Sequence, residues 1–363
     1  MLALREMRRR KVQFALVTGV VALVSFLIIM VTGLGLGLYE RAGTALLSLN
    51  GDHLAYADNA SISLIRSRLT EAQVRDVETD AGAEEATPIG YVAATIEYAP
   101  GENETAAVVG VIPGSFAVPS VIEGRPLSTP TDLLVDRSWS RLAGTGIGDV
   151  LPLPVGFDSR EFTVVGIVDE GYFFFQSAVY VSLEAWQGIA YQGDPGQRPA
   201  ASVVLLRGGD IANDRGNGWE VVSKQTAFDN IEGVQAQQST VNALRYMGLL
   251  IGAMVIGVFF YVITLQKVSL LGILKAIGAS GLYLVGQGLL QVFVVSVIGT
   301  ALAAGLALLR EATVLSSDAI PIAFTTGAIA TTAFSVLVAG LVGAALSVRQ
   351  VAAIDPIVAM QQQ

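Results

Sequence analysis

The sequence predicts an integral membrane α-helical protein with four transmembrane helices and an α/β extracytoplasmic domain inserted between helices 1 and 2. Of the 363 residues, 52% are apolar and only 15% are charged. Soluble domains are about 45–50% apolar and about 25% charged. The apolar residues also gather in four long runs, and an acidic segment of different character separates the first run from the second. These two observations together predict the fold class.

The four runs predict transmembrane helices over residues 12–38, 243–265, 282–309 and 322–348. Each run supplies the roughly 20 apolar residues that a helix needs to cross a hydrocarbon layer about 30 Å thick. Their central turns carry no Lys, Arg, Asp or Glu; Arg245 lies at the very edge of the second run. The first run is longer than the apolar core of a cleaved signal peptide, so we expect it to be retained as an anchor.

The segments between the runs predict the orientation of the chain in the membrane. The amino-terminal residues 1–11 are basic, which places them in the cytoplasm. Alternation then places residues 39–242 and the loop 310–321 outside, and the segment 266–281 and the tail 349–363 inside. The sequence thus predicts a multi-pass protein of the cell (plasma) membrane with both termini in the cytoplasm.

Residues 39–242 predict one water-facing α/β domain. They hold 27 acidic and 12 basic residues, so a general nucleic-acid-binding surface is excluded. Stretches rich in Val, Ile and Thr, such as 91–98, 161–168 and 178–182, alternate as strands do. Residues 69–80 and 219–227 have the composition of short helices, and strands interleaved with helices favour an α/β or α+β arrangement.

No catalytic motif is present. The chain has no cysteine and a single histidine, His53, which excludes disulfides, thiolate metal sites and cysteine nucleophiles. None of its four lysines follows a glycine, so it lacks the phosphate-binding loop of an ATPase. We therefore expect a protein that is not an enzyme, with no intrinsic cofactor and no metal site.

Three stretches resemble the FtsX/MacB-type permeases of ATP-binding cassette exporters. Residues 134–153 (LVDRSWSRLAGTGIGDVLPL), followed by FTVVGI at 162–167, are similar to the family's extracytoplasmic domain. Residues 264–280 (TLQKVSLLGILKAIGAS) resemble its short cytoplasmic helix, and residues 348–360 (VRQVAAIDPIVAM) resemble its closing segment. With the predicted topology, the likeness covers nearly the whole chain, and it is greatest to the short branch that includes the haem exporter HrtB and DevC.

The resemblance implies a homodimer that works with two separate ATPase subunits, one docked on the segment 266–281 of each protomer. In that segment apolar residues recur at three- and four-residue steps, as on a short amphipathic helix that presses into a partner's groove. A plain interfacial connector is the alternative. The predicted coupling residues are Lys267, Leu270, Leu271, Leu274, Lys275 and Ile277.

The resemblance also implies contact between the first and second helices of the two protomers. Two pairs of glycines spaced by four residues, Gly33 with Gly37 and Gly248 with Gly252, would let helix backbones approach closely in lipid. Flexible outer helix ends are the competing explanation.

Family members of this short form include exporters of haem and of glycolipids, which makes haem a possible transported substrate here. Haem iron accepts His, Met or Tyr as axial ligands. Candidates near the outer membrane face are Met30, Tyr39, His53, Tyr246 and Met247, with Arg245 available to pair a propionate and Glu40 beside them. Ordinary packing in lipid is the alternative explanation for the two methionines, and anchoring at the membrane interface is the alternative for the two tyrosines.

Two other functions remain open from the sequence. Some relatives carry no cargo and transmit ATPase closure to an extracytoplasmic hydrolase or lipoprotein. A membrane-anchored sensor is a further alternative, and it would not associate with an ATPase.

Overall fold

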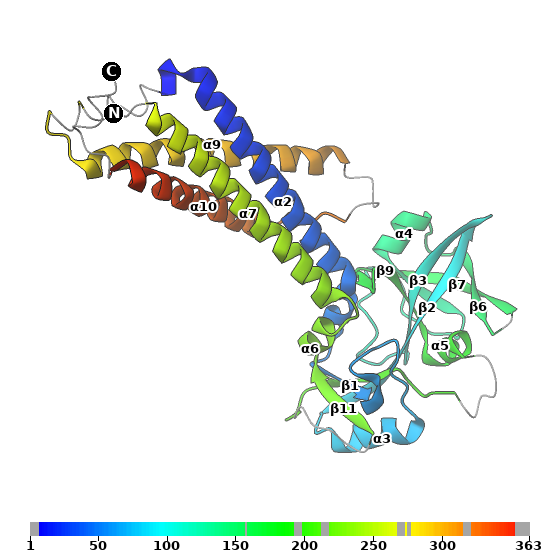
Figure 1. Cartoon of the computed structure of the whole chain (residues 1–363). Helices are drawn as coiled ribbons and strands as arrows, with labels where there is room; N and C mark the ends of the chain where they lie inside the picture. The colour runs from blue at the N-terminus through cyan, green and yellow to red at the C-terminus, as the bar shows by residue number, and fades with distance from the viewer. Residues whose placement is uncertain are drawn as a thin grey trace. The chain divides into compact units, whose positions relative to one another are not determined.

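The computed structural model describes residues 7–156, 158–191, 198–211, 218–266, 273, 277–314 and 321–352. The chain divides into two compact units (Figure 1). One comprises Met1–Gly37 and Gln238–Gln363, and the other comprises Leu38–Gln237. The first unit is helical and the second is built around a β-sheet.

The helical unit contains four helices that are long and apolar enough to cross a membrane, counted within the described residues. This confirms the predicted fold class. Two of the helices, α2 and α7, run on into the second unit. Their bounds are α2 Lys11–Ser48, α7 Val234–Leu265, α9 Gly281–Val314 and α10 Thr326–Ala352.

Small residues bring these helices together. All four helices contribute to one apolar cluster, which includes Phe14 of α2, Phe260 of α7 and Val292 of α9. A Cβ atom added to Gly343 of α10 would lie 2.2 Å from the carbonyl oxygen of Ala253 on α7, so the two backbones are almost in contact. Close approach at small residues is how helices associate in lipid, where no hydrophobic force drives them together.

The second unit is the α/β domain between the first and second membrane helices. Its described strands form a sheet in the order β11-β1-β10-β2-β3-β9-β5-β7-β4, with β6 beside β7 and β8 beside β9. Most neighbours are antiparallel, and the pairs β3–β9 and β5–β7 are parallel. The strands are β1 His53–Ala57, β2 Glu85–Ala99, β3 Glu102–Val111, β4 Glu123–Gly124, β5 Asp132–Asp136, β6 Val150–Val155, β7 Asp158–Val168, β8 Tyr172–Phe173, β9 Gln176–Ser182, β10 Val203–Arg207 and β11 Trp219–Ser223.

Short helices connect these strands, and their ends follow the local sequence. Helix α3 begins after Thr70, whose hydroxyl accepts from the Gln73 N–H while the Gln73 side chain accepts from the Thr70 N–H. This reciprocal cap satisfies two N–H groups that the first turn leaves free. The helices are η1 Asp58–Ala60, α3 Glu71–Asp80, α4 Arg137–Ala143, α5 Leu183–Ala190 and α6 Lys224–Asp229.

The helix predicted over residues 219–227 is wrong in its first half. Trp219–Ser223 is strand β11, paired antiparallel with β1, and only Lys224–Asp229 is helical. Alternating burial places Trp219 and Val221 in the core. The pairing partner lies far away in the sequence, so local composition could not reveal it.

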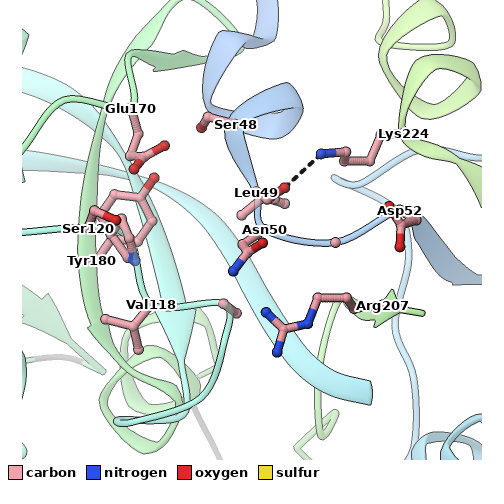
Figure 2. Close-up of a pocket in the computed structure, with 13 residues that line it drawn as sticks. Ser48, Leu49, Asn50, Asp52, Val118, Ser120, Glu170, Tyr180, Arg207 and Lys224 are labelled. Atoms are coloured by element: carbon pink, nitrogen blue, oxygen red, sulfur yellow. Dashed lines mark hydrogen bonds between the residues drawn. The ribbon is translucent and has the colours of Figure 1, made fainter. Parts of the chain in front are cut away.

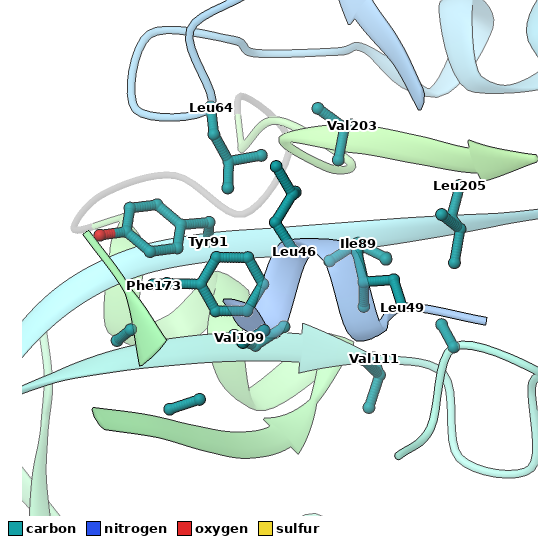
Figure 3. Packing of buried hydrophobic residues seen from close by; sticks show 14 of the residues in the cluster. Leu46, Leu49, Leu64, Ile89, Tyr91, Val109, Val111, Phe173, Val203 and Leu205 are labelled. Atoms are coloured by element: carbon teal, nitrogen blue, oxygen red, sulfur yellow. The ribbon is translucent and has the colours of Figure 1, made fainter. Parts of the chain in front are cut away.

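The core of this domain includes the outer end of α2. Ala42, Ala45 and Leu46 of that helix, and Leu49 just after its end, are buried in one cluster with side chains from the sheet. Figure 3 shows Leu46 and Leu49 among Ile89, Val109, Val203 and Leu205. The last turns of α2 are therefore part of the fold of the α/β domain.

Candidate functional site

The seam between α2 and α7 is the first candidate site, because most of the sequence-predicted residues of the helical unit lie on these two helices. Added Cβ atoms show how close the two backbones are: that of Gly35 would lie 2.5 Å from Val241, that of Gly248 3.0 Å from Ile28, and that of Gly252 3.1 Å from Val24. The two helices thus pack through small residues over about three turns of α7.

The four glycines predicted for the dimer contact all lie against other segments of the same chain. Gly248 and Gly252 face α2, as above, whereas Gly33 packs on Phe324 and Gly37 on the backbone of Pro321. Small residues at this spacing do permit close helix approach, and here that approach is within one subunit. A role for these glycines between protomers stays a prediction.

Arg245 lies on the face of α7 that meets α2. It is four residues after Val241 and three before Gly248, which places all three side chains on one helix face. Arg245 is half-buried, and within the described part of the chain its Nε has no hydrogen-bond partner. An ionisable residue at an apolar helix seam is costly, and such residues commonly mark a binding site.

The other predicted ligands of the helical unit are not gathered around one point. Met30 of α2 packs against Ile29 and two alanines of α9, Ala303 and Ala307. Tyr246 and Met247 of α7 are 65% and 61% exposed in the single chain. Met30 is thus a packing residue in this structure, while the two α7 side chains are open to lipid or to a partner.

The remaining predicted ligands lie in the α/β domain. The Tyr39 ring packs at a tilt against Phe228 with ring centroids 4.5 Å apart, and Glu40 beside it is exposed. His53 begins strand β1, is half-buried, and its Nδ1 has no hydrogen-bond partner among the described residues. Packing against α6 therefore explains Tyr39, and the free nitrogen of His53 has no structural explanation.

The predicted coupling segment is described at one of its predicted residues. Ile277 is 78% exposed, which leaves its side chain free for a partner. Lys267, Leu270, Leu271, Leu274 and Lys275 lie outside the described residues.

A polar cavity of about 490 Å³ in the α/β domain was not predicted from the sequence. It opens beside the carboxyl end of α2, where the Lys224 ammonium donates to the carbonyls of Leu47 (3.0 Å) and Leu49 (2.7 Å). Figure 2 shows Asn50 and Arg207 on one side of it and Glu170 and Tyr180 on the other. Since its walls come from segments scattered along the sequence, no local signal could have revealed it.

Burial and a nearby carboxylate disfavour charge on the tyrosine of this cavity. Tyr180 is almost completely buried, and the pKa of its hydroxyl is raised well above the usual value by burial first and by Glu170 second. Tyr180 is therefore a neutral donor or acceptor at every physiological pH.

Comparison with known families assigns the class of the protein. Residues 14–213 match the MacB-like periplasmic core domain, and residues 242–356 match the FtsX-like permease C-terminal domain. The first match covers more than half of the chain, so the chain belongs to the MacB-like family. It is a membrane protein with an extracytoplasmic domain, and a permease of this family is a transport subunit that implies an ATPase partner.

Individual relatives narrow the type to ABC transporter permeases like HrtB and MacB. The chain is 24% identical, over 99% of its length and 98% of the relative, to a "Putative hemin transport system permease protein HrtB" of Staphylococcus haemolyticus. It is also 24% identical, over 98% of both chains, to an uncharacterized ABC transporter permease of Mycobacterium tuberculosis. The periplasmic region of MacB from Actinobacillus actinomycetemcomitans aligns with 52% of this chain and 96% of its own, at 13% identity and a TM-score of 0.35.

Proposed function

We propose that this chain is the permease subunit of an exporter that expels haem from the membrane to the outside, as a homodimer with two separate ATPase subunits. The observation that carries the proposal is the full-length similarity to a relative whose name assigns it to hemin transport. In this proposal both termini and the segment 266–281 are cytoplasmic, and the ATPase docks on that segment.

The chemistry of the α2–α7 seam supports an amphipathic, anionic cargo. Haem is a flat apolar ring with two carboxylates, so it partitions into the bilayer and can reach the seam sideways. The Arg245 guanidinium is a planar donor suited to a carboxylate, and its Nε is free of other bonds within the described residues. Tyr246 and Met247, the next two residues of α7, are exposed and project away from the seam, so their phenol and thioether would reach the iron only from the outer face of α7.

The exposed face of α7 supports a second copy of the chain as the other wall of the site. Met247, Leu250, Met254 and Val258 recur at three- and four-residue steps and are all largely exposed. A dimer that meets along this face would enclose Met247 between the two subunits and shield the cargo from lipid. The four membrane helices found in the described part of one subunit are too few to enclose a pathway, which is a further argument for the dimer.

Titration of the purified permease–ATPase complex with hemin tests this proposal. We expect a shifted Soret band at stoichiometric hemin, and a dissociation constant about tenfold higher in Arg245→Gln, the loss of one charge-assisted hydrogen bond. Met247→Leu should change the band position with little effect on affinity. Arg160→Gln, which removes an exposed arginine of β7, is the matched control and should bind as the unmodified protein does.

A second candidate function is force transmission without cargo. It is favoured by one observation: the outer end of α2 is built into the core of the α/β domain, which would carry helix movement outward. An unchanged Soret spectrum, together with a co-purifying extracytoplasmic hydrolase or lipoprotein, would favour this function over haem export.

A further inference from the structure

Helix α2 is interrupted inside the α/β domain, at Gly43. The backbone dihedral angles there are not helical (φ 178°, ψ 39°). A side chain at this position would collide with the core, because an added Cβ would lie 2.6 Å from Ile231 and 3.2 Å from Phe228. The interruption leaves carbonyl groups of the preceding turn without their usual helical partners.

A hairpin from the sheet supplies the missing partners. We call residues 171–176, which comprise β8, the turn at residues 174–175 and the first residue of β9, the strap. The Phe174 N–H donates to the carbonyl of Ala42 (2.9 Å), and the Phe175 N–H donates to that of Arg41 (2.7 Å). The Tyr172 N–H donates to Oγ1 of Thr44 (3.2 Å), on the far side of the kink. The strap thus binds α2 on both sides of Gly43.

The backbone of the strap is held in an unfavourable conformation. Phe174 and Phe175 both lie in the left-handed region, with φ of 48° and 67°. Two consecutive bulky residues there are rare, and they persist only where surrounding contacts hold them. The Tyr91 ring supplies one such contact, 5.0 Å from Phe174 and 6.0 Å from Phe173, and the Arg41 guanidinium over the Tyr172 ring at 5.2 Å supplies another.

The strap leads directly into the middle of the sheet. Strand β9 follows it and is hydrogen-bonded to β3 on one side and to β5 on the other. On the other flank of α2, Lys224 binds the carbonyls of Leu47 and Leu49. The end of the helix is therefore fixed to a central strand and to α6.

We propose that the strap and the Gly43 kink form the joint through which movement of α2 enters the α/β domain, with Phe174 and Phe175 as positioning residues. This inference rests on the proposed function, because the ATPase of the exporter supplies the movement. The strap keeps the helix end and strand β9 together through the cycle, so that displacement of α2 moves the sheet and is not lost at the kink.

Substitution of Phe175 separates this role from ordinary packing. Phe175→Pro removes the N–H that binds Arg41 and requires a φ near −65°, so it releases the strap. Phe175→Gly is the matched control, since it loses the same ring but keeps the N–H and adopts positive φ freely. In full-length permease–ATPase complexes in lipid vesicles, we expect Phe175→Pro to keep ATP hydrolysis while export per ATP falls about tenfold, as the loss of one hydrogen bond allows. Phe175→Gly should stay within about twofold of the unmodified protein.

A distance measurement tests the joint independently of the cargo. The chain has no cysteine, so spin labels can be placed at Glu40→Cys on α2 and Asp158→Cys on β7 alone. We expect one narrow distance that is the same without nucleotide and after trapping with ATP and vanadate, and a broadened distribution in Phe175→Pro. If the unmodified complex fails to export hemin, the proposal that haem is the cargo is wrong, but the distance measurement still tests the joint.

Two results would overturn the inference: Phe175→Pro complexes with an unchanged export-to-ATP ratio, or a Glu40–Asp158 distance that changes on trapping in the unmodified chain. If Phe175→Pro fails to assemble, Thr44→Val decides, because it removes only the Oγ1 that accepts from the Tyr172 N–H and leaves the backbone of the strap unchanged. A lower export-to-ATP ratio in Thr44→Val supports the joint, whereas an unchanged ratio contradicts it.

Discussion

The two units of this chain differ in how far their large apolar side chains are exposed. In the α/β domain Trp139, Phe162 and Trp186 are completely buried. In the helical unit Phe334 is 67% exposed in the single chain, and each of the four helices exposes other large apolar side chains. The first pattern is typical of a domain in water, where the hydrophobic effect buries large apolar side chains. The second is typical of membrane helices, whose apolar surfaces face lipid or a partner subunit.

The difference predicts which substitutions the chain tolerates. Trp186→Ala should cost the α/β domain about 3–5 kcal/mol of unfolding free energy, as large truncations in well-packed cores do. The Trp186 ring fills the space above Gly90 and Gly110, where no Cβ would fit, so the site cannot collapse easily. Chemical denaturation of the full-length protein measures the loss. Phe334→Ala is the matched truncation in the helical unit and should leave the denaturation midpoint almost unchanged; equal effects would contradict the comparison.

Among the described residues, a buried carboxylate, Asp132, also distinguishes the α/β domain from the helical unit. Asp132 is 3% exposed, pairs with Arg125 (2.6 Å), and accepts from the N–H groups of Ser128 and Thr129. These partners, the guanidinium above all, lower the pKa of its carboxyl. The pair therefore stabilises the domain above the unfolded pKa of about 3.9, and the contribution is lost as the pH falls below that value towards the native pKa.

Asp132→Asn should cost about 2 kcal/mol near pH 7 by the loss of charge-assisted bonds. Its stability should also fall less steeply than that of the unmodified protein between about pH 4 and pH 2. Urea denaturation across this pH range measures both effects, and identical pH profiles for the two proteins would show that Asp132 contributes nothing.

Glycine packing tests the helical unit directly. Gly343→Ala places a methyl group against the α7 backbone and should cost about 1–3 kcal/mol by forcing the two helices apart. Gly305→Ala on α9 is the control, because nothing lies within 4 Å of its added Cβ. Thermal unfolding in detergent should show a lower midpoint for the first variant alone.

The smallest effect belongs to the exposed ion pairs of the α/β domain. Arg75 and Glu71 of α3 approach to 3.6 Å, but both side chains are largely exposed. Arg75→Ala should therefore change the unfolding free energy by less than about 0.5 kcal/mol. A larger loss in the same denaturation assay would mean that surface charge contributes more to this domain than its core suggests.

The membrane helices and the α/β class could be predicted because their signals are local. An uncharged apolar run of about 20 residues or more predicts a membrane-spanning helix, and alternating Val, Ile and Thr residues favour strands. Strand β11 was mistaken for a helix because its partner β1 is remote in sequence. Gly248 and Gly252 illustrate the same limit: their spacing predicts close helix contact, but not that the neighbour is α2 of the same chain.

The candidate site was predicted less completely for the same reason. Arg245 stood out as the charge at the edge of an apolar run, and the structure places it at the α2–α7 seam. Tyr39 and Met30 were predicted on the same grounds, residue type and a position near the outer membrane face. In the structure, however, Tyr39 packs against Phe228 and Met30 packs against α9. The strap and the polar cavity depend on hydrogen bonds between distant segments, which composition and spacing do not encode.

Hemin export by the reconstituted complex is the decisive test of the proposed function. Vesicles of the permease with its ATPase, loaded with hemin in the membrane, should release it to an external haem-binding protein when ATP is added on the cytoplasmic face. We expect release that requires ATP and is slower in Arg245→Gln. Release at the same rate without nucleotide, or no release from a complex that hydrolyses ATP normally, would contradict it.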